Sequence, residues 1–167
     1  MEQILRLANN QDLPEINEIY NQAIDTRCST GDHFHVTMEE RQQWFENHPP
    51  EKCPVIVYEY NGKIAGWICL SPYRNGRTGF KFTAELSYYV HNNYKQKGIG
   101  SILLKSIIEK AKTLNYTTLI AMLFATNIAS IKLLEKYQFQ KWGCLPQIID
   151  IDDIKYDHLC YGLKIGE

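Results

Sequence analysis

The chain has 167 residues, enough to bury a sizeable core, and we expect residues 1–167 to form a single domain. Its 18 lysine and arginine residues are balanced by 19 aspartate and glutamate residues, so nucleic acid is not an expected partner. The N-terminus lacks a signal-like pattern and no run approaches the ~20 apolar residues of a membrane span, so we expect a cytoplasmic protein that does not bind membranes.

The N-terminal segment predicts a short strand over Ile4–Leu7 and then a helix. Asp12 is the expected N-cap of this helix, because Pro14 suits a first turn and Glu15 completes a capping box with Asp12. The apolar periodicity predicts that the helix ends near Asp25.

A polar loop over residues 26–36 precedes a second predicted helix. Thr37 and Glu40 form the pattern of a capping box, and Pro49 stops the helix that follows. Asn61-Gly62 separates two apolar runs, Pro54–Tyr60 and Lys63–Leu70, and is a strong signal for a two-residue hairpin. Antiparallel strands are therefore expected here.

The second half of the chain alternates strand and helix patterns. The predicted elements are a strand over Phe80–Val90, a helix from Ile102, a strand over Leu119–Phe124, a helix capped by Asn127, and closing strands over Phe139–Leu145 and His158–Ile165. The element order β-α-α-β-β-β-α-β-α-β-β predicts the α/β (α+β) class, with a mixed, mostly antiparallel twisted sheet and helices on both faces.

A glycine-containing turn, residues Tyr94–Ser101, joins the strand that ends at Val90 to the following helix. Gly98 and Gly100 let backbone N–H groups turn toward a ligand, and the helix N-terminus adds its positive dipole end. Lys95 and Lys97 would add cationic side chains, so the turn predicts a pyrophosphate site. The dinucleotide fingerprint is excluded, because its third glycine position holds Leu103. Glycines required for tight geometry alone are the alternative interpretation.

Two segments resemble the GNAT acetyltransferases. Lys95-x-x-Gly98-x-Gly100 resembles the Gln/Arg-x-x-Gly-x-Gly/Ala motif that grips the acetyl-CoA pyrophosphate in that family, with lysine in the first position. Residues 127–139 resemble the family's Asn-x-x-Ser block, at the spacing that the family shows. Further segments, including residues 71–74 and 85–90, are similar to the phosphinothricin acetyltransferase subgroup, so the resemblance covers nearly the whole chain.

The resemblance implies the GNAT fold, acetyl-CoA as co-substrate, no metal, and a homodimer. It implies a small-molecule amine as acceptor, such as an amino acid or an analogue like phosphinothricin or methionine sulfone. Glu85 stands at the position of the general base. The residues expected to bind acetyl-CoA are Tyr88, Tyr89, Val90, Lys95, Gln96, Lys97, Gly98, Ile99, Gly100, Ser101, Asn127 and Ser130.

Acyl transfer from a thioester requires a neutral amine and donors for the oxyanion that forms. Glu85 can remove the amine proton directly or through water if burial raises its pKa, and strand alternation places Ser87 and Tyr89 on its face. A strand N–H group near Tyr89 or Val90 is the expected oxyanion donor. A structural partner for Glu85 is the alternative.

Tyr73 and Arg74 are the expected acceptor-binding residues, because a guanidinium offers a carboxylate two parallel donors. A solvated arginine in a loop is equally compatible with the sequence. His33 and His35 lack a third ligand at fixed spacing, and the five cysteines form no CxxC pair, so loop histidines and free thiols are expected rather than a metal site.

Two other functions remain open at this stage. One is acetylation of a protein N-terminus or a lysine side chain, which an extended charged docking groove would favour. The other is a non-catalytic sensor that binds acetyl-CoA without turnover. Retention of Glu85 argues against the sensor.

Overall fold

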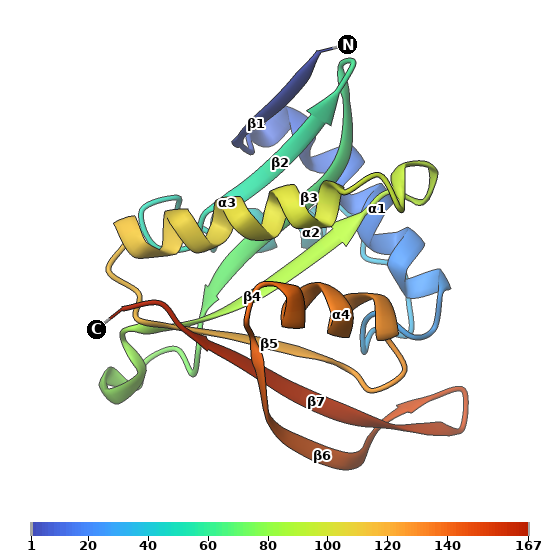
Figure 1. The fold of residues 1–167 in the computed structure, drawn as a ribbon. Helices are drawn as coiled ribbons and strands as arrows, with labels where there is room; N and C mark the ends of the chain where they lie inside the picture. Colours follow the sequence, from blue (N-terminus) through green and yellow to red (C-terminus); the bar gives the residue numbers. More distant parts are fainter. Residues whose placement is uncertain (1, 167) are drawn as a thin grey trace.

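A single sheet joins all the strands that the computed structural model contains over residues 2–166, the described part of the chain. The strands are β1 (Gln3–Leu7), β2 (Val55–Tyr60), β3 (Lys63–Pro72), β4 (Thr83–Val90), β5 (Thr118–Phe124), β6 (Gln140–Ile151) and β7 (Ile154–Lys164). The α-helices are α1 (Leu13–Asp25), α2 (Met38–Glu46), α3 (Ile99–Thr113) and α4 (Ile128–Lys136), and 3-10 turns cover Asn10–Asp12, Thr78–Phe80 and Asn92–Tyr94. The predicted order of elements is confirmed (Figure 1).

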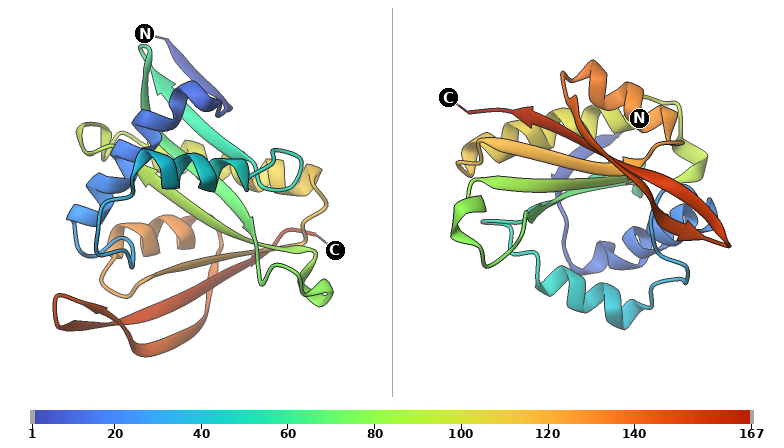
Figure 2. Two further views of the ribbon diagram at one scale, coloured as in Figure 1. Left: turned by 180° about the vertical axis from the view of Figure 1, so that it is seen from behind. Right: turned by 90° about the horizontal axis from the view of Figure 1, so that it is seen from below.

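The strand order is β1-β2-β3-β4-β5-β7-β6. Only β4 and β5 pair in parallel; every other neighbouring pair is antiparallel. Helices α3 and α4 cover one face of the sheet and α1 and α2 cover the other, as the views from behind and from below show (Figure 2). The predicted mixed sheet with helices on both faces is therefore confirmed.

Each face of the sheet has its own buried core. Leu103, Leu104 and Ile107 of α3 are fully buried in the larger core, which also includes Leu134 of α4. The smaller core packs α1 against β2 and β3 around Trp67, whose indole N–H donates to the backbone oxygen of Ile16 at 3.1 Å. Apolar residues recur every 3.6 residues along the helices, so each helix has an apolar side that packs against the sheet.

The start of α1 differs from the predicted capping box. Asp12 makes no side-chain cap for α1; its carboxylate instead accepts from Arg6 at 2.7 Å and from the N–H of Asn9 at 2.8 Å. Glu15 accepts the N–H of Ile64 at 2.7 Å. The prediction was wrong because a tertiary ion pair with Arg6 is a stronger partner for this carboxylate than the helix end. The second capping box, Thr37 with Glu40, is confirmed.

The predicted hairpin at Asn61-Gly62 is confirmed, since Tyr60 pairs with Lys63 and both turn residues have positive φ values of 48° and 75°. The strand predicted from Phe80 begins at Thr83, because Thr78–Phe80 forms a 3-10 turn.

The helix predicted from Ile102 begins three residues earlier, at Ile99.

The closing strands are longer than predicted and form one hairpin, β6–β7. Asp152 and Asp153 adopt positive φ values of 52° and 67° in its turn. β6 continues through Pro146, because it is the edge strand of the sheet, where a missing N–H is tolerated. No helix among residues 2–166 is long and apolar enough to cross a membrane.

Candidate active site

The sheet divides between β4 and β5. The two strands pair over only three positions, ending at Glu85 and Ile120. Beyond this point β4 continues to Val90 along β3, while β5 continues to Phe124 along β7. We call the separated segments, Leu86–Val90 and Ala121–Phe124, the strand fork. In the strand fork, backbone N–H and C=O groups of β4 and β5 have no neighbouring strand between them, as at the edge of a sheet. A ligand can therefore form hydrogen bonds with these groups.

A glycine turn follows directly from the fork. Gln96 and Gly98 adopt the left-handed region with φ values of 62° and 79°, and α3 begins at Ile99. Gly100 also has a packing role, because a Cβ there would lie 2.9 Å from the side chain of Leu133 in α4. Both the phosphate interpretation and the geometric interpretation of these glycines therefore have a physical basis.

The first N–H groups of α3 are available to a ligand. Ser101 and Ile102 donate to the backbone oxygen of Gly98 at 3.0 and 3.2 Å. Within residues 2–166, the N–H groups of residues 97–100 find no backbone acceptor. A helix N-terminus with such unpaired donors favours an anion.

One cavity of about 560 Å³ connects the fork to the glycine turn. Its volume lies in the usual range for a small-molecule site. It is lined by Ala23, Thr26, Cys28, Ser29, Leu86, Ser87, Tyr88, Tyr89, Val90, Asn92, Tyr94, Lys95, Gln96, Gly98, Ile99, Gly100, Ser101, Ala121, Met122, Leu123, Asn127, Ala129, Ser130, Leu133 and Leu134. The residues predicted to bind acetyl-CoA are all in this lining except Lys97, whose ammonium lies 5.0 Å from the centre of the Tyr94 ring.

Helix α4 closes the cavity opposite β4. Asn127 caps this helix, since its side-chain oxygen accepts the N–H of Ser130 at 3.2 Å. The cap explains the presence of Asn127 without a ligand, although both residues also line the cavity. The sequence did not single out Thr26, Cys28 and Ser29, which follow α1 and reach the cavity only through the tertiary fold.

The backbone of β4 determines which N–H groups face the fork. The N–H of His91 donates to Ala65 of β3 at 2.9 Å. Because bonded and non-bonded pairs alternate along an antiparallel ladder, the N–H of Tyr89 also faces β3, and those of Tyr88 and Val90 face the fork. Of the two oxyanion donors expected from the sequence, the geometry therefore favours Val90 over Tyr89.

Glu85 lies at the last paired position before the fork, opposite Ser71 of β3. Burial raises the pKa of its carboxyl. Within residues 2–166 its carboxylate has neither an ion pair nor a side-chain hydrogen bond, which leaves the structural-partner alternative without support. A half-buried carboxylate with a raised pKa is suited to general-base chemistry.

The side of β4 that carries Glu85 faces α1 and α2, and we call its polar groups the acceptor side. Tyr20 of α1 bonds to two residues of the loop that follows this helix, at 2.8 Å to the Thr30 hydroxyl and 2.5 Å to the Asp32 carboxylate. Burial, together with the Asp32 bond, raises the pKa of Tyr20 to about 12. The edge of the Tyr20 ring packs against Tyr89, with the ring centres 5.0 Å apart.

A buried arginine stabilises the same side. Arg41 is only 3% exposed, and its guanidinium lies 4.6 Å from the centre of the Tyr20 ring and 4.7 Å from that of Trp44. Its Nε donates to Asn17 at 3.1 Å. Burial lowers the pKa of Arg41. The sequence analysis assigned no role to Arg41 or Tyr20, because the two side chains meet only after α2 packs on α1.

His48 reaches the strand position opposite Glu85. Its Nδ1 lies 2.6 Å from the backbone oxygen of Trp44, so Nδ1 carries the proton and Nε2 accepts from the Ser71 hydroxyl at 3.0 Å. Burial lowers the pKa of His48, which favours this neutral form. The sequence analysis did not identify His48 or Ser71 as candidates.

The predicted acceptor residues lie at the exposed edge of this side. Tyr73 directly follows Pro72, the last residue of β3, and its N–H donates to the backbone oxygen of Thr83 at 3.2 Å. Arg74 adopts a φ of 50° in an exposed turn, with its guanidinium 5.7 Å from the Tyr73 ring centre. Neither residue lines the cavity.

The two loop histidines do not come together with further metal ligands. His35 contacts Asp25 at 2.6 Å, and the His33 ring packs beside Phe34. Residues 2–166 contain no group of three His, Cys, Asp or Glu side chains that could hold a metal ion, and all five cysteines are free thiols.

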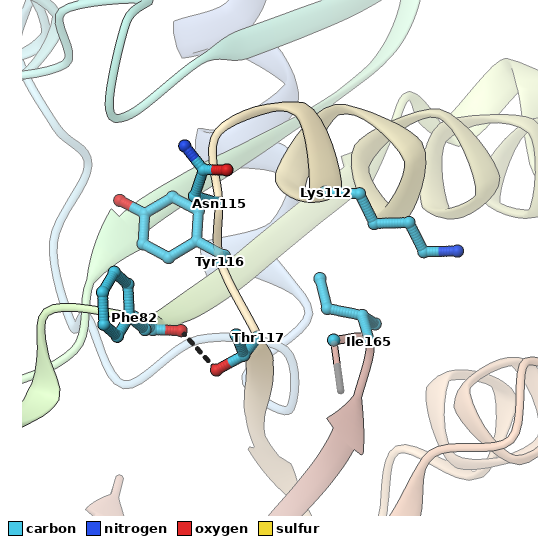
Figure 3. A pocket seen from close by; sticks show the side chains of 7 residues that line it. Phe82, Lys112, Asn115, Tyr116, Thr117 and Ile165 are labelled. Atoms are coloured by element: carbon cyan, nitrogen blue, oxygen red, sulfur yellow. Dashed lines mark hydrogen bonds between the residues drawn. The ribbon is translucent and has the colours of Figure 1, made fainter.

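A second depression, at the far end of α3, lacks acyl-transfer chemistry. Figure 3 shows its lining, in which Lys112 points away from Tyr116 and the hydroxyl of Thr117 bonds to the backbone of Phe82 at 3.5 Å. Among residues 2–166, no carboxylate and no glycine turn line this depression. The strand fork is therefore the better candidate.

Comparisons with known proteins point to the same region. A family model described as "Acetyltransferase (GNAT) family" matches residues 16–139, which include the fork, the glycine turn and α4. The Bacillus subtilis protein named "Putative phosphinothricin acetyltransferase YwnH" is 37% identical over 162 residues, which cover 97% of this chain and 99% of that protein.

A second relative and a solved structure extend the comparison. An L-methionine sulfoximine/L-methionine sulfone acetyltransferase of Salmonella typhimurium is 31% identical over 86% of this chain and 84% of its own length. The crystal structure of a GNAT superfamily phosphinothricin acetyltransferase from Sinorhizobium meliloti, in complex with acetyl-CoA, superposes with a TM-score of 0.94 at 26% identity. It covers 100% of this chain and 90% of that one.

Proposed function

Because the chain belongs to the GNAT acetyltransferase family, we propose that it acetylates the primary amine of an amino acid or amino-acid analogue, with Glu85 as general base. Family membership makes the chain an acetyl-CoA-dependent N-acetyltransferase. The observation that carries the finer proposal is the single cavity, which joins unpaired strand backbone to a glycine turn and lies next to a carboxyl group of raised pKa.

The residues present fit a CoA thioester. The glycine turn and the N-terminus of α3 offer N–H donors to a pyrophosphate, and the exposed Lys95 adds a positive charge. The fork offers the polar backbone of Val90 to the amides of the pantetheine arm. Asn127 and Ser130 would lie against the same arm.

Two N–H groups are available for the oxyanion. Those of Tyr88 and Val90 face the fork, so either can donate to the thioester oxygen as negative charge develops there. The N–H and C=O groups of Tyr89 both face β3, and the proposed role of Tyr89 is therefore restricted to its side chain.

Glu85 would remove the proton that the amine must lose. Its ionised form is required, and burial raises its pKa, so the carboxylate is a stronger base than that of an exposed glutamate. The neutral amine then attacks the carbonyl carbon. The proton would pass to Glu85 directly or through one water.

The acceptor is proposed to be an amino acid because two relatives are named for phosphinothricin, methionine sulfoximine and methionine sulfone. Arg74, beside Tyr73 at the open edge of the acceptor side, would pair with the acceptor carboxylate. We assign residues 1–167 to one acetyltransferase domain, supported by the single sheet. The homodimer implied by the resemblance stays a prediction. Light scattering, which measures the mass of the protein in solution, tests it.

The test is release of CoA thiol from acetyl-CoA across a panel of amines. The panel contains amino acids, methionine sulfone, methionine sulfoximine, phosphinothricin, polyamines and short peptides, with a reaction lacking acceptor as control. Turnover with an amino-acid-like amine supports the proposal. Turnover with peptides alone would replace it with protein acetylation, and binding of acetyl-CoA without any turnover would replace it with a sensor.

A further inference from the structure

Three polar side chains lie in a row at the strand position of Glu85. Ser71 of β3 is the register partner of Glu85, and Tyr73 donates to the backbone oxygen of Thr83 two positions along the same ladder. Ser71 and Glu85 are therefore a hydrogen-bonded pair, and their side chains leave the sheet on one face with Cβ atoms about 5 Å apart. The Nε2 of His48 lies 3.0 Å from the Ser71 hydroxyl. We call His48, Ser71 and Glu85 the polar row.

The outer end of the polar row determines the direction of its hydrogen bonds. The Nδ1 of His48 donates to the backbone oxygen of Trp44 at 2.6 Å, since a carbonyl oxygen can only accept. Burial, together with the positive charge of Arg41, lowers the pKa of His48, so the ring is neutral and Nε2 keeps a lone pair. The Ser71 hydroxyl therefore donates to His48, and its only proton points away from Glu85.

The Glu85 carboxylate is left without a donor. Within residues 2–166 it forms no ion pair, and burial by itself accounts for the raised pKa of its carboxyl. The Ser71 oxygen, with its proton directed at His48, has lone pairs that can accept a hydrogen bond from a protonated Glu85. The polar row is thus arranged to receive a proton at Glu85.

We propose that His48 is a positioning residue for Glu85: by accepting the Ser71 hydroxyl, it makes Ser71 an acceptor toward Glu85 rather than a donor. This inference rests on the proposed function. In the reaction an N–H bond of the acceptor's ammonium group breaks, the proton forms an O–H bond on Glu85, and the electron pair stays on nitrogen for the attack. The new O–H donates to Ser71. Glu85 returns the proton to water after the product leaves.

The polar row makes Glu85 a stronger base. A hydrogen bond donated by the neutral carboxyl to Ser71, and strengthened by the bond from Ser71 to His48, stabilises the protonated form. A donor at the same position would instead stabilise the carboxylate and weaken the base. The direction of a single hydroxyl proton therefore decides how readily Glu85 takes a proton.

Other titratable groups face this side from every neighbouring element. They are Tyr20 of α1, Arg41 of α2, Cys69 of β3, Tyr89 of β4, and His158 and Cys160 of β7, with Asp32 and Arg74 at the exposed rim. Burial raises the pKa values of the two thiols and the two phenols, so these four groups stay neutral while a carboxyl titrates. Burial lowers the pKa of His158, which brings it closer to the range of a carboxyl.

The decisive variant is His48→Phe, whose ring can keep the packing on Trp44, where the ring centres are 4.2 Å apart. The Ser71 hydroxyl loses its acceptor and can then donate to Glu85. We expect the pKa of Glu85 to fall by about one unit, and the plateau value of kcat to fall by about three- to tenfold because the base is weaker. The dissociation constant of acetyl-CoA should stay unchanged, since the polar row does not line the cavity.

Two measurements follow the pKa of Glu85. Carbon NMR of protein labelled at its glutamate carboxyl groups reports the titration directly, with Glu85→Gln to assign the signal. The pH profile of kcat/KM for the acceptor reports the same group during turnover, and its acid limb should move to lower pH in His48→Phe. The NMR titration needs neither acetyl-CoA nor an acceptor.

Ser71→Ala tests the direction of the hydroxyl by the sign of its effect. In the wild type this substitution removes an acceptor from the neutral carboxyl, so the pKa of Glu85 should fall by about half a unit. In the His48→Phe background it removes a donor from the carboxylate, so the pKa should rise. Loss of packing alone gives no such reversal of sign.

His158→Phe is the matched control. His158 is another histidine of the acceptor side with a pKa lowered by burial, but among residues 2–166 no hydrogen bond joins its ring to Ser71 or Glu85. We expect the pKa of Glu85 to stay unchanged in this variant.

The outcomes separate this inference from the proposed function. An unchanged Glu85 pKa in His48→Phe would overturn the inference, as would a rise in Ser71→Ala, whether or not the wild type acetylates an amine. If His48→Phe does not fold, the sign of the shift in Ser71→Ala decides alone. The reversal of sign supports the positioning role. A lowered Glu85 pKa with an unmoved acid limb and unchanged kcat would show that Glu85 is not the base, which overturns that part of the proposed function.

Discussion

The two faces of β4 are built in different ways. On the face toward α3 and α4, the candidate cofactor site consists mainly of backbone groups, glycines and helix ends within residues 86–101 and 121–134. On the other face, the acceptor side consists of side chains from α1, α2, β3 and the loop between the helices. The first arrangement can accept one fixed ligand across a family, whereas the second can change its acceptor by changing a few side chains.

The largest effect is expected from Glu85→Gln. Loss of the general base should lower kcat by about 10²- to 10⁴-fold, while the dissociation constant of acetyl-CoA stays unchanged because Glu85 does not line the cavity. Thiol-release kinetics and calorimetric binding measure the two quantities. Loss of acetyl-CoA affinity in this variant would instead show that Glu85 contributes to the cofactor site. The division of roles between the two faces of β4 would then be wrong.

The pH profile of the wild type sharpens this prediction. Because burial raises the pKa of Glu85, activity should fall as the pH drops through a value above the usual range of a glutamate. A folded-state pKa above the unfolded one also means that ionising this buried carboxyl costs stability as the pH rises. Glu85→Gln should therefore lack the pH dependence and unfold at the same or a higher temperature near neutral pH.

Arg41→Lys should reduce the free energy of unfolding by about 2 kcal/mol, because lysine keeps the charge but loses the planar stacking on two rings and the bond to Asn17. Denaturant unfolding measures this. The KM for the acceptor should rise, and acetyl-CoA affinity should not change. Arg27→Lys, at an exposed ion pair of 3.4 Å with Asp152, is the control and should change stability by less than about 0.5 kcal/mol. Equal losses in both variants would show that the buried stacking contributes nothing.

On the cofactor side, Gly98→Ala is paired with Gly62→Ala. Both glycines have left-handed φ values, 79° and 75°, and open space where a Cβ would lie. Each alanine should cost about 1 kcal/mol of stability. Only Gly98→Ala should raise the dissociation constant of acetyl-CoA, by about fivefold, since strain at the turn displaces its N–H donors. Equal acetyl-CoA affinity in the two variants would show that the glycine turn does not bind acetyl-CoA.

The smallest effect is expected from Asp32→Asn. Its bond to Tyr20 is exposed on one side, so we expect a two- to fivefold change in acceptor KM, corresponding to about 0.5–1 kcal/mol, and no change in acetyl-CoA affinity. Burial and the Asp32 carboxylate raise the pKa of Tyr20 to about 12, so removing that charge should lower it in an ultraviolet titration. An unmoved pKa would mean that burial alone accounts for the shift.

The sequence was a better guide to one face of β4 than to the other. The glycine turn and the Asn127 block are continuous segments, and local rules of turns and helix ends are enough to identify them. The capping box assigned to Asp12 failed because Arg6, brought close by the fold, competes for the same carboxylate. His48, Ser71 and Arg41 were missed for a related reason, since no local pattern links segments that meet only across α2 and β3.

The sequence by itself determined the order of elements, the GNAT resemblance, the glycine turn and the position of Glu85. Only the tertiary structure decided that β4 and β5 separate after Glu85, that the N–H of Val90 rather than that of Tyr89 faces the fork, and that His48 reaches the Ser71 hydroxyl. Strand registers and side-chain partners depend on contacts between distant segments. Periodicity and turn signals report only the conformation of each segment by itself.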